Sequence, residues 1–186
     1  SLAKTTGIEC FNISLAKNKV LKINYITEQL GGDRLANAVA AYRCYGGPCL
    51  VIDFGTATTY NSVLADGTFD GGIIAPGIKT SIEFLIEHSG LLSEIPLKHP
   101  ETFMGHTSEE ALISGYYYTF IGQVKEIMEN LKRSLDSDYL TIGTGGLVDF
   151  AAQVFPQIVA DKDLTLVGIK MIYDENRPVT KTKNMK

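Results

Sequence analysis

Hydrophobic and polar positions along the chain follow patterns that predict strands alternating with helices. After Asp33, the expected N-cap, Leu35 and Val39 recur at the spacing of one helical face. The glycines and proline at 46–48 supply the turn chemistry that would end this helix. The first thirty residues mix Lys, Asn and Thr with scattered aliphatic residues and carry little pattern. The regular pattern therefore begins near Asp33.

Three strands are predicted between residues 49 and 74. Residues 49–53 form a short apolar run that ends on the carboxylate of Asp53, as in a buried strand. Two further strands, 58–64 and 68–74, flank Asp66-Gly67, a pair typical of a tight hairpin turn. These tight connections predict an antiparallel arrangement of the three strands.

The second half of the chain is predicted to alternate helices and strands. Ile78, Ile82 and Leu85 open an amphipathic helix, and the proline-containing segment 89–106 is typical of a loop. The further elements expected are a long helix near 110–131, a strand at 139–142, a helix after Gly146, a short strand at 158–160 and a last helix capped by Thr165. Together with the antiparallel strands, this alternation indicates an α/β domain with a mixed sheet.

Composition and charge narrow the class of protein. The chain has 186 residues, of which 45% are hydrophobic and 20% charged, as in an ordinary globular protein. Seventeen basic against 21 acidic residues give a net charge of −4, so neither a nucleic acid nor a membrane is an expected partner. No apolar run reaches the ~18 residues of a membrane span. The three cysteines form no C-x-x-C pair, which argues against a zinc site or a disulfide framework. A soluble, cytoplasmic protein is expected.

The segment from Asp53 to Thr59, with the sequence DFGTATT, carries the most informative chemistry. A carboxylate leaves a buried strand and meets a glycine turn followed by three threonine hydroxyls. Glycine lets the backbone approach a phosphate closely, hydroxyls donate to its oxygens, and Asp53 could face a cation that shields the charge. The alternative is a β-hairpin with a satisfied polar turn, and the short motif alone does not separate the two.

The sequence Gly31-Gly32-Asp33-Arg34 places a carboxylate and a guanidinium at the first turn of a helix. Asp is a favoured N-cap, so a purely structural role is the first alternative. Arg34 adds a bidentate receptor for an anion, which capping does not require. The pair suits phosphoryl transfer to an alcohol, in which Asp33 takes the hydroxyl proton and Arg34 holds a substrate carboxylate or the transferring phosphoryl group.

A third segment, Thr144-Gly145-Gly146, lies between a predicted strand and a predicted helix. It is neither a G-x-G-x-x-G fingerprint nor a Walker A loop, but a glycine pair at a helix N-terminus can accept a nucleotide's sugar or phosphate. The histidines form no cluster with metal-ligand spacing, and no serine lies in a G-x-S-x-G setting. Taken alone, this segment is a weak sign of nucleotide binding.

Six segments in order resemble the type III pantothenate kinases, a branch of the acetate and sugar kinase/Hsc70/actin superfamily. They are GGDRLANAVAAY, GGPCLVIDFGTATT, GGIIAPGI, GHTSEEALISG, the TGG at 144–146 and DLTLVGIKMIY. The resemblance implies an α/β, ribonuclease-H-like fold of the actin/Hsc70/sugar-kinase type, a mixed sheet with flanking helices. It also implies ATP-dependent phosphorylation of pantothenate to 4′-phosphopantothenate, the first step of coenzyme A biosynthesis.

The same resemblance implies roles for single residues. Asp33 matches the catalytic base, and Asp53 matches a ligand of a monovalent cation, K⁺ or NH₄⁺. The residues that match substrate contacts are Tyr25, Gly31, Gly32, Asp33, Arg34 and Ser108, the last standing where the family usually has Thr. The residues expected to contact ATP, the phosphoryl donor that would come with Mg²⁺, are Gly55, Thr56, Gly145 and Gly146.

The front of the chain departs from the family pattern. Family members begin with a strand and an Asp-x-Gly-Asn-Thr loop that grips the ATP phosphates, whereas residues 1–30 contain no Asp. The chain would then comprise the remainder of an amino-terminal ribonuclease-H-like subdomain (1–48), a complete carboxy-terminal one (49–176) and a polar tail (177–186). On this interpretation, the chain is expected to be inactive alone.

A homodimer and two alternative functions complete the expectations. The long helix carries an aromatic-rich face, with Tyr116, Tyr117, Tyr118 and Phe120, that is typical of an interface core. One alternative function is a non-enzymatic transcriptional accessory protein of the same family, and the other is a different small-molecule kinase of the superfamily. The Gly-Asp-Arg and Asp-Phe-Gly-Thr segments favour the enzyme, and the Asp33–Arg34 pair favours a carboxylate-bearing alcohol such as pantothenate.

Overall fold

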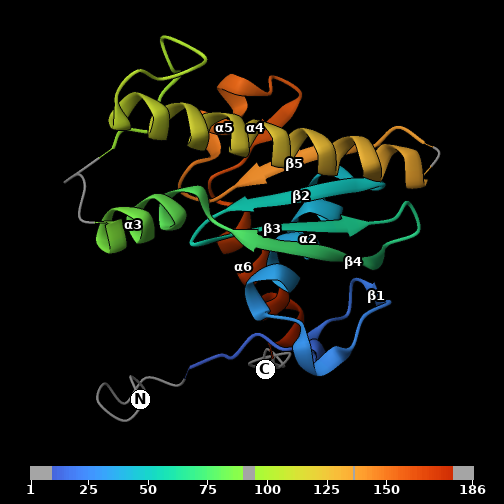
Figure 1. Cartoon of the computed structure of the whole chain (residues 1–186). Helices are drawn as coiled ribbons and strands as arrows, with labels where there is room; N and C mark the ends of the chain where they lie inside the picture. The colour runs from blue at the N-terminus through green and yellow to red at the C-terminus, as the bar shows by residue number, and fades with distance from the viewer. Residues whose placement is uncertain (1–9, 90–94, 136, 178–186) are drawn as a thin grey trace, which may run out of the picture.

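A six-stranded sheet lies at the centre of the computed structural model, which describes residues 10–89, 95–135 and 137–177 (Figure 1). The strands are β1 (Lys22–Ile23), β2 (Cys49–Phe54), β3 (Ala57–Val63), β4 (Thr68–Pro76), β5 (Leu140–Thr144) and β6 (Ile158–Ala160). The helices are α2 (Gly32–Tyr45), α3 (Ile78–Ser89), α4 (Ser108–Leu135), α5 (Val148–Val154) and α6 (Leu164–Asn176). Two 3₁₀ turns, η1 (Leu15–Lys17) and η2 (Thr27–Gln29), precede α2.

The sheet is mixed, as predicted, with the strand order β1-β4-β3-β2-β5-β6. Strands β2, β3 and β4 are antiparallel neighbours, whereas β1–β4, β2–β5 and β5–β6 are parallel pairs. Gly67 has φ 79° in the turn between β3 and β4, which confirms the predicted hairpin at Asp66-Gly67. In register, Asp53 of β2 lies opposite Thr59 of β3 and beside Thr144 of β5. Two of the three segments with candidate chemistry therefore meet at the carboxyl ends of β2 and β5.

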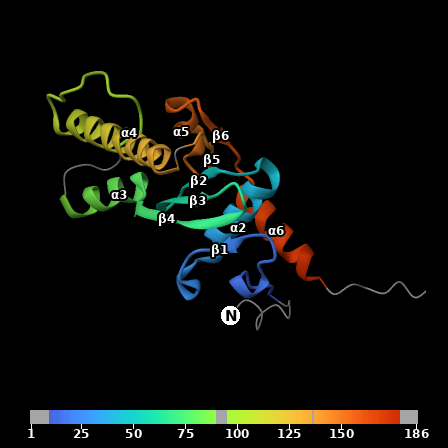
Figure 2. The same ribbon diagram turned by 90° about the vertical axis from the view of Figure 1, so that its right-hand side faces the viewer.

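Helices cover both faces of the sheet (Figure 2). Helices α2 and α6 pack on one face, where Val39 and Ile172 share a core with Val51 of β2. Helices α3, α4 and α5 pack on the other face, where Phe120 shares a core with Ile52 of β2. Because side chains alternate along a strand, successive residues of β2 supply both cores. This two-faced burial explains why residues 49–52 read as a continuous apolar run.

Helices α2 and α6 approach each other closely at Gly168. A β-carbon at this position would collide with the backbone carbonyl of Ala36 on α2, so the absence of a side chain permits the contact. The core on this side also contains Cys49, the first residue of β2, which is fully buried. Burial raises the pKa of the Cys49 thiol to about 12. The two helices therefore pack tightly against each other and against this face of the sheet.

The starts of two helices differ from the prediction. Helix α2 has Gly31 as its N-cap, so Asp33 is not the cap but lies inside the first turn. Helix α6 follows Asp163 as its N-cap, so Thr165 does not cap it. In both cases the predicted residue has a cap-forming side chain, but the N-cap lies two positions earlier in the chain. The polar side chains of Asp33 and Thr165 are therefore used elsewhere.

Two predicted apolar faces also need correction. On α3, Leu85 is 45% exposed, whereas its neighbour Ile86 packs against the core, since Ile78, Ile82 and Ile86 continue one helical stripe. On α4, the aromatic cluster is divided between two environments. Tyr116, Tyr117 and Phe120 are buried in the core, and Tyr118 is 38% exposed. Most of the cluster therefore serves packing within the chain.

The described residues form one sheet, in which β1 of the first 48 residues pairs with β4 of the following part. The predicted subdomain division at residue 48 stays a prediction, and the predicted tail lies outside the described residues from residue 178 onward. Across the described ranges, no helix combines the length and the apolar character needed to cross a bilayer.

Candidate functional site

Asp53, at the end of β2, is held by a hydrogen-bonded chain of side chains from two helices. The Asn37 side chain of α2 donates to Asp53 Oδ2 at 3.0 Å, and Thr165 of α6 donates to Asn37 Oδ1 at 2.6 Å. The Thr165 hydroxyl fixes the orientation of the Asn37 amide, because the amide oxygen accepts this bond and its NH₂ group must then face Asp53. Sequence analysis assigned neither Asn37 nor Thr165 to the functional site. A polar Asn inside an apolar helical pattern was the available signal.

Two glycine-containing turns surround the Asp53 carboxylate. Gly145 follows β5 with φ 89°, and a β-carbon there would lie 2.5 Å from Asp53 Oδ1. A β-carbon at Gly55 would lie 3.5 Å from the same oxygen. Thr56 and Gly146 are exposed at this edge. The structure therefore brings together the four residues expected to contact ATP and leaves one carboxylate oxygen uncovered beside them.

Gly77, the residue that follows β4, supports the Gly55–Thr56 turn. Its N–H donates to the Thr56 carbonyl at 3.0 Å, and a β-carbon there would collide with the carbonyl of Gly55. The start of α3 therefore packs directly against the Gly55–Thr56 turn. The close approach fixes the shape of the turn that the Asp53–Thr59 motif predicts.

Asp33 lies close to this edge, at the start of α2. Its carboxylate accepts a hydrogen bond from the backbone N–H of Arg34 at 2.8 Å, and its side chain is exposed. A β-carbon at Gly31 would lie 2.5 Å from Asp33 Oδ1, and one at Gly32 would lie 3.1 Å from the Ile13 carbonyl. A side chain at position 31 would displace the Asp33 carboxylate, and one at position 32 would press on the Ile13 backbone. Asp33 keeps an accessible oxygen, as a proton acceptor requires.

The charges of the two carboxylates influence each other. Burial, the largest cause, raises the pKa of Asp53, the hydrogen bond from Asn37 lowers it, and the negative charge of Asp33 raises it. The last effect reflects the proximity of the two groups across the α2–β2 boundary. Two neighbouring carboxylates attract a cation. Asp53 Oδ1 is suited to ligate one, because the hydrogen bond from Asn37 goes to the other oxygen, Oδ2. Over the described residues, no group of three or more potential metal ligands is present.

Arg34 lies next to Asp33 but points into the protein. It is 5% exposed, and its Nε donates to Asn61 Oδ1 of β3 at 2.7 Å. Its Nη1 donates to the Tyr25 hydroxyl at 3.2 Å, so the structure brings Tyr25 and Arg34 together, while the contact of Tyr25 with substrate stays a prediction. The remaining nitrogen, Nη2, is buried and has no partner in the described part of the chain. An unsatisfied buried donor on a charged group is costly, and an anion would satisfy it.

Ser108 is not brought to this site within the chain. It is exposed at the first residue of α4, which covers the opposite face of the sheet from α2. The Thr107 side chain caps this helix, since it accepts from the Glu110 N–H at 3.2 Å, and Glu110 accepts from the His106 N–H at 2.7 Å. The hydroxyl of Ser108 is therefore not needed for capping. Its expected contact with substrate stays a prediction.

Comparisons with known proteins give a family. Residues 1–130 match the sequence profile of the type III pantothenate kinases. The type III pantothenate kinase of Agathobacter rectalis is 44% identical over 148 residues, 78% of this chain and 57% of that protein. The corresponding protein of Paramagnetospirillum magneticum is 41% identical over 150 residues, 80% of this chain and 58% of that protein. The chain thus spans a little over half the length of these curated relatives.

A solved structure is similar over most of the chain. The crystal structure of a conserved protein from Campylobacter jejuni, described as a Baf family transcriptional activator, matches with a TM-score of 0.59 and 26% identity. The match covers 86% of this chain and 71% of that one. The profile match and the identity to curated relatives decide the family. The chain belongs to the type III pantothenate kinases.

Proposed function

We propose that the protein transfers the γ-phosphoryl group of ATP to pantothenate and forms 4′-phosphopantothenate and ADP. The observation that carries the proposal is the Asp33–Arg34 pair, which combines an accessible carboxylate with a buried guanidinium whose Nη2 has no partner. Pantothenate has a primary hydroxyl at one end and a carboxylate at the other. One acceptor and one anion receptor at the start of α2 suit these two groups, and family membership points to the same substrate.

In this reaction Asp33 acts as the general base. The substrate hydroxyl oxygen attacks the γ-phosphorus, its proton passes to Asp33, and the bond between the γ-phosphorus and the β–γ bridging oxygen breaks to release ADP. Phosphoryl transfer depends mainly on positioning and charge neutralisation. Arg34 would hold the carboxylate, while Gly31 and Gly32 let the backbone approach the substrate.

The ATP site is proposed at the carboxyl ends of the neighbouring strands β2 and β5. Gly55 and Gly145 leave room for phosphate oxygens beside Asp53, and the exposed Thr56 hydroxyl and Gly146 lie at the same edge. Asp53 Oδ1 would ligate a monovalent cation, K⁺ or NH₄⁺, that shields the phosphate charge. Mg²⁺ would accompany the triphosphate. A cytoplasmic location stays a prediction.

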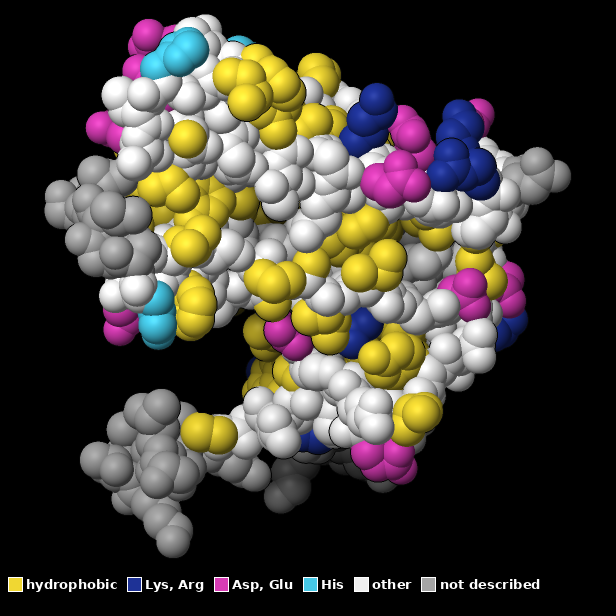
Figure 3. Space-filling view, viewed as in Figure 1, with side chains coloured by type: hydrophobic (Ala, Val, Ile, Leu, Met, Phe, Trp, Pro, Cys, Tyr) yellow, Lys and Arg dark blue, Asp and Glu magenta, His cyan; other side chains and the backbone are white. Residues whose placement is uncertain are grey.

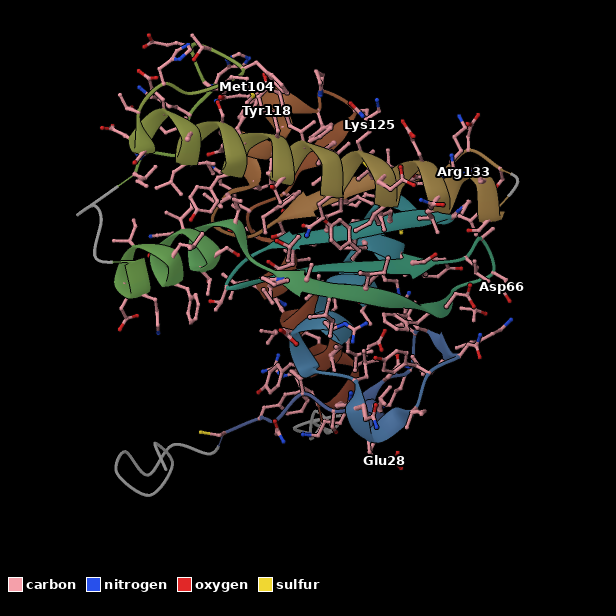
Figure 4. All side chains as sticks on the ribbon, viewed as in Figure 1. Glu28, Asp66, Met104, Tyr118, Lys125 and Arg133 are labelled. Atoms are coloured by element: carbon pink, nitrogen blue, oxygen red, sulfur yellow. The ribbon has the colours of Figure 1, made fainter. Side chains whose placement is uncertain are left out.

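A homodimer is proposed through the exposed side of α4. Figure 3 shows hydrophobic side chains gathered over the first half of this helix, the region in which Figure 4 labels Met104 and Tyr118. Phe103 and Met104 are 68% and 70% exposed, and the Phe103 and Tyr118 rings are in edge contact with centroids 4.9 Å apart. The dimer would also give the exposed Ser108 at the start of the same helix a neighbour in a second chain.

The decisive test is the formation of phosphopantothenate. Turnover of ATP and labelled pantothenate is measured for the 186-residue chain alone and after mixing with the amino-terminal segment of the Agathobacter rectalis relative. We expect ATP- and potassium-dependent product from the mixture and far less from the chain alone, because a misplacement of ~1 Å in the phosphates can cost about 10²-fold. Lack of pantothenate binding in both samples would instead favour a regulatory role, the one named for the Campylobacter jejuni protein.

A further inference from the structure

The three nitrogens of the Arg34 guanidinium have unequal surroundings. Nε donates to Asn61 Oδ1 at 2.7 Å and Nη1 donates to the Tyr25 hydroxyl at 3.2 Å, whereas Nη2 has no partner among the residues that the structure describes. The guanidinium is thus anchored at the Nε end. Its outer edge, formed by Nη1 and Nη2, is the edge that binds a carboxylate with two parallel hydrogen bonds.

Asn61 fixes this orientation from the middle of β3. Its side chain is fully buried, and its amide NH₂ donates to the Thr59 hydroxyl at 3.3 Å while its amide oxygen accepts from Arg34 Nε. Both ends of the amide are therefore engaged, and the oxygen cannot turn away from Arg34 without losing two bonds. Asn61 holds the guanidinium by one side and leaves the opposite edge for a ligand.

Gly72 packs closely against the buried Nη2 side of that edge. It lies on β4 directly across from Asn61. A β-carbon at position 72 would lie 2.7 Å from Arg34 Nη2 and 2.8 Å from Asn61 Oδ1. A side chain here would push the guanidinium out of its position. Glycine at this strand position is thus explained by the close approach of the Tyr60 backbone carbonyl together with that of Arg34.

Tyr25 occupies part of the place that a carboxylate would take. Its ring centroid lies 5.1 Å from the guanidinium carbon of Arg34, and its hydroxyl accepts only from Nη1. A neutral hydroxyl binds a guanidinium less strongly than a carboxylate does, and it leaves Nη2 unsatisfied. Displacement of the Tyr25 hydroxyl by a carboxylate would replace one long hydrogen bond with two charge-assisted bonds.

The position of the Nη1–Nη2 edge of Arg34 also sets the orientation in which the substrate would bind. Along β3, Thr59 lies between Asn61 and the turn, and it is in register with Asp53. The anion receptor at Arg34 is therefore about two residues, or ~7 Å of strand, from the phosphate edge. A substrate with a carboxylate at one end and a reactive hydroxyl at the other can span this separation.

We propose that Asn61 and Gly72 are positioning residues that hold Arg34 so that its Nη1–Nη2 edge binds the substrate carboxylate in place of the Tyr25 hydroxyl. This inference rests on the proposed function, and it makes the pair Asn61 and Gly72 determinants of specificity for an acid over the matching neutral alcohol. Pantothenol, in which a primary alcohol replaces the carboxylate of pantothenate, is the discriminating ligand.

The test is calorimetric titration of the 186-residue chain with pantothenate, with pantothenol and with ATP. Asn61→Asp has nearly the same shape as Asn61, keeps an acceptor for Nε and cancels the charge that the ligand needs. We expect it to weaken pantothenate binding by about ten- to a hundredfold, the usual range for a hydrogen bond to a charged group, with pantothenol and ATP unchanged. Gly72→Ala is expected to act in the same direction, because its new methyl displaces Nη2.

Ser62→Ala is the matched control. Ser62 is the next residue on β3, points to the opposite face of the sheet, and has a buried hydroxyl without a partner in the described chain. Its loss should leave all three affinities unchanged. Equal weakening of pantothenate and pantothenol in Asn61→Asp, or no weakening of either, would overturn the inference while the proposed function stands. Lack of pantothenate binding by the wild-type chain, both alone and after mixing with the amino-terminal segment of the Agathobacter rectalis relative, would overturn both.

Discussion

At the scale of the residue, the site depends on polar side chains that are buried within the fold, one on helix α2 and one on strand β3. Asn37 and Asn61 are fully buried, and each orients one charged group, Asp53 in the first case and Arg34 in the second. The charged residues were predictable from the sequence, because Asp and Arg beside glycines are recognisable motifs. The asparagines were not, since their partners are 16 and 27 residues away and only folding brings them together.

Asp33→Asn tests the assignment of the general base. Asn keeps the shape of the side chain and the oxygen that accepts from the Arg34 N–H, but it cannot take the hydroxyl proton. Turnover by the active, reconstituted enzyme is expected to fall by ~10²–10⁴-fold, with ATP affinity nearly unchanged. Steady-state kinetics and ATP titration measure the two quantities. Turnover like that of the wild type would remove Asp33 from its role.

Asp53→Asn tests the electrostatics of the site through stability. Burial and the charge of Asp33 raise the pKa of Asp53 above 3.8, so the folded chain binds this proton more readily than the unfolded chain. The contribution of Asp53 to stability is therefore fully present below the unfolded value and is lost as pH rises through the folded value. Without ligands, Asp53→Asn should melt at a higher temperature than the wild type near neutral pH, and this advantage should vanish at low pH.

A control of opposite sign comes from Asp66 at the tip of the hairpin, which Figure 4 labels. The hydrogen bond from Lys22 lowers the pKa of Asp66 to about 2, so its contribution is present above the unfolded value and is lost as pH falls. Asp66→Asn should therefore lower the melting temperature near neutral pH, slightly because the pair is exposed. A pH-independent advantage for Asp53→Asn in thermal unfolding by circular dichroism would contradict the assigned cause.

At the scale of the element, the sequence predicted those helices, strands and turns whose signal is local, either a hydrophobic period or a turn motif. The hairpin at Asp66-Gly67, the long helix α4 and the strand β6 follow from such patterns, and each is confirmed. The starts of α2 and α6 were misplaced because several cap-forming residues stand close together, and only the backbone decides among them. The pairing of β1 with β4 could not be predicted, since two residues carry no period.

Gly168→Ala tests the contact between α2 and α6. The new methyl would collide with the Ala36 carbonyl and force the helices apart, which is expected to cost about 1–3 kcal/mol of the free energy of unfolding. Gly122→Ala on α4 is the matched control, because a β-carbon there meets no atom within 4 Å. That exchange should stabilise the chain by roughly 0.5–1 kcal/mol, as Ala favours the helix more than Gly. Urea denaturation measures both, and equal effects would refute the close contact.

At the scale of the whole molecule, the two faces of the sheet have different surroundings. Helix α2 brings Asp33 close to Asp53 of β2 on one face, whereas the region of α4 on the other face presents an exposed apolar surface. An interface through α4 would therefore leave Asp33 and Asp53 accessible to their ligands. The family pattern predicted a dimer, but the sequence alone assigned the buried Tyr116 and Tyr117 to the interface, because a helical period does not separate the core from an outer apolar patch.

Met104→Asp tests the dimer. A charge in the apolar patch is expected to weaken self-association by about tenfold or more if Met104 lies in the interface core. Leu166→Asp is the matched control, since Leu166 is 66% exposed, close to the 70% of Met104, but lies on α6 at the opposite face. Sedimentation equilibrium of the chain and of both variants measures the association. A wild-type monomer, or equal effects of the two substitutions, would contradict an interface at α4.

Because Cys49 is buried, alkylation of its thiol can measure how often the core between the sheet and α2 opens. With a thiol pKa of about 12, almost no reactive thiolate exists at neutral pH, and the folded core excludes an alkylating reagent. In a background of Cys10→Ser and Cys44→Ser, the rate of alkylation would therefore count the events in which the sheet separates from α2. A ligand held between Asp33 on α2 and Asp53 on β2 would make these events rarer. Protection of one sulfur atom from alkylation would thus report substrate occupancy without any turnover.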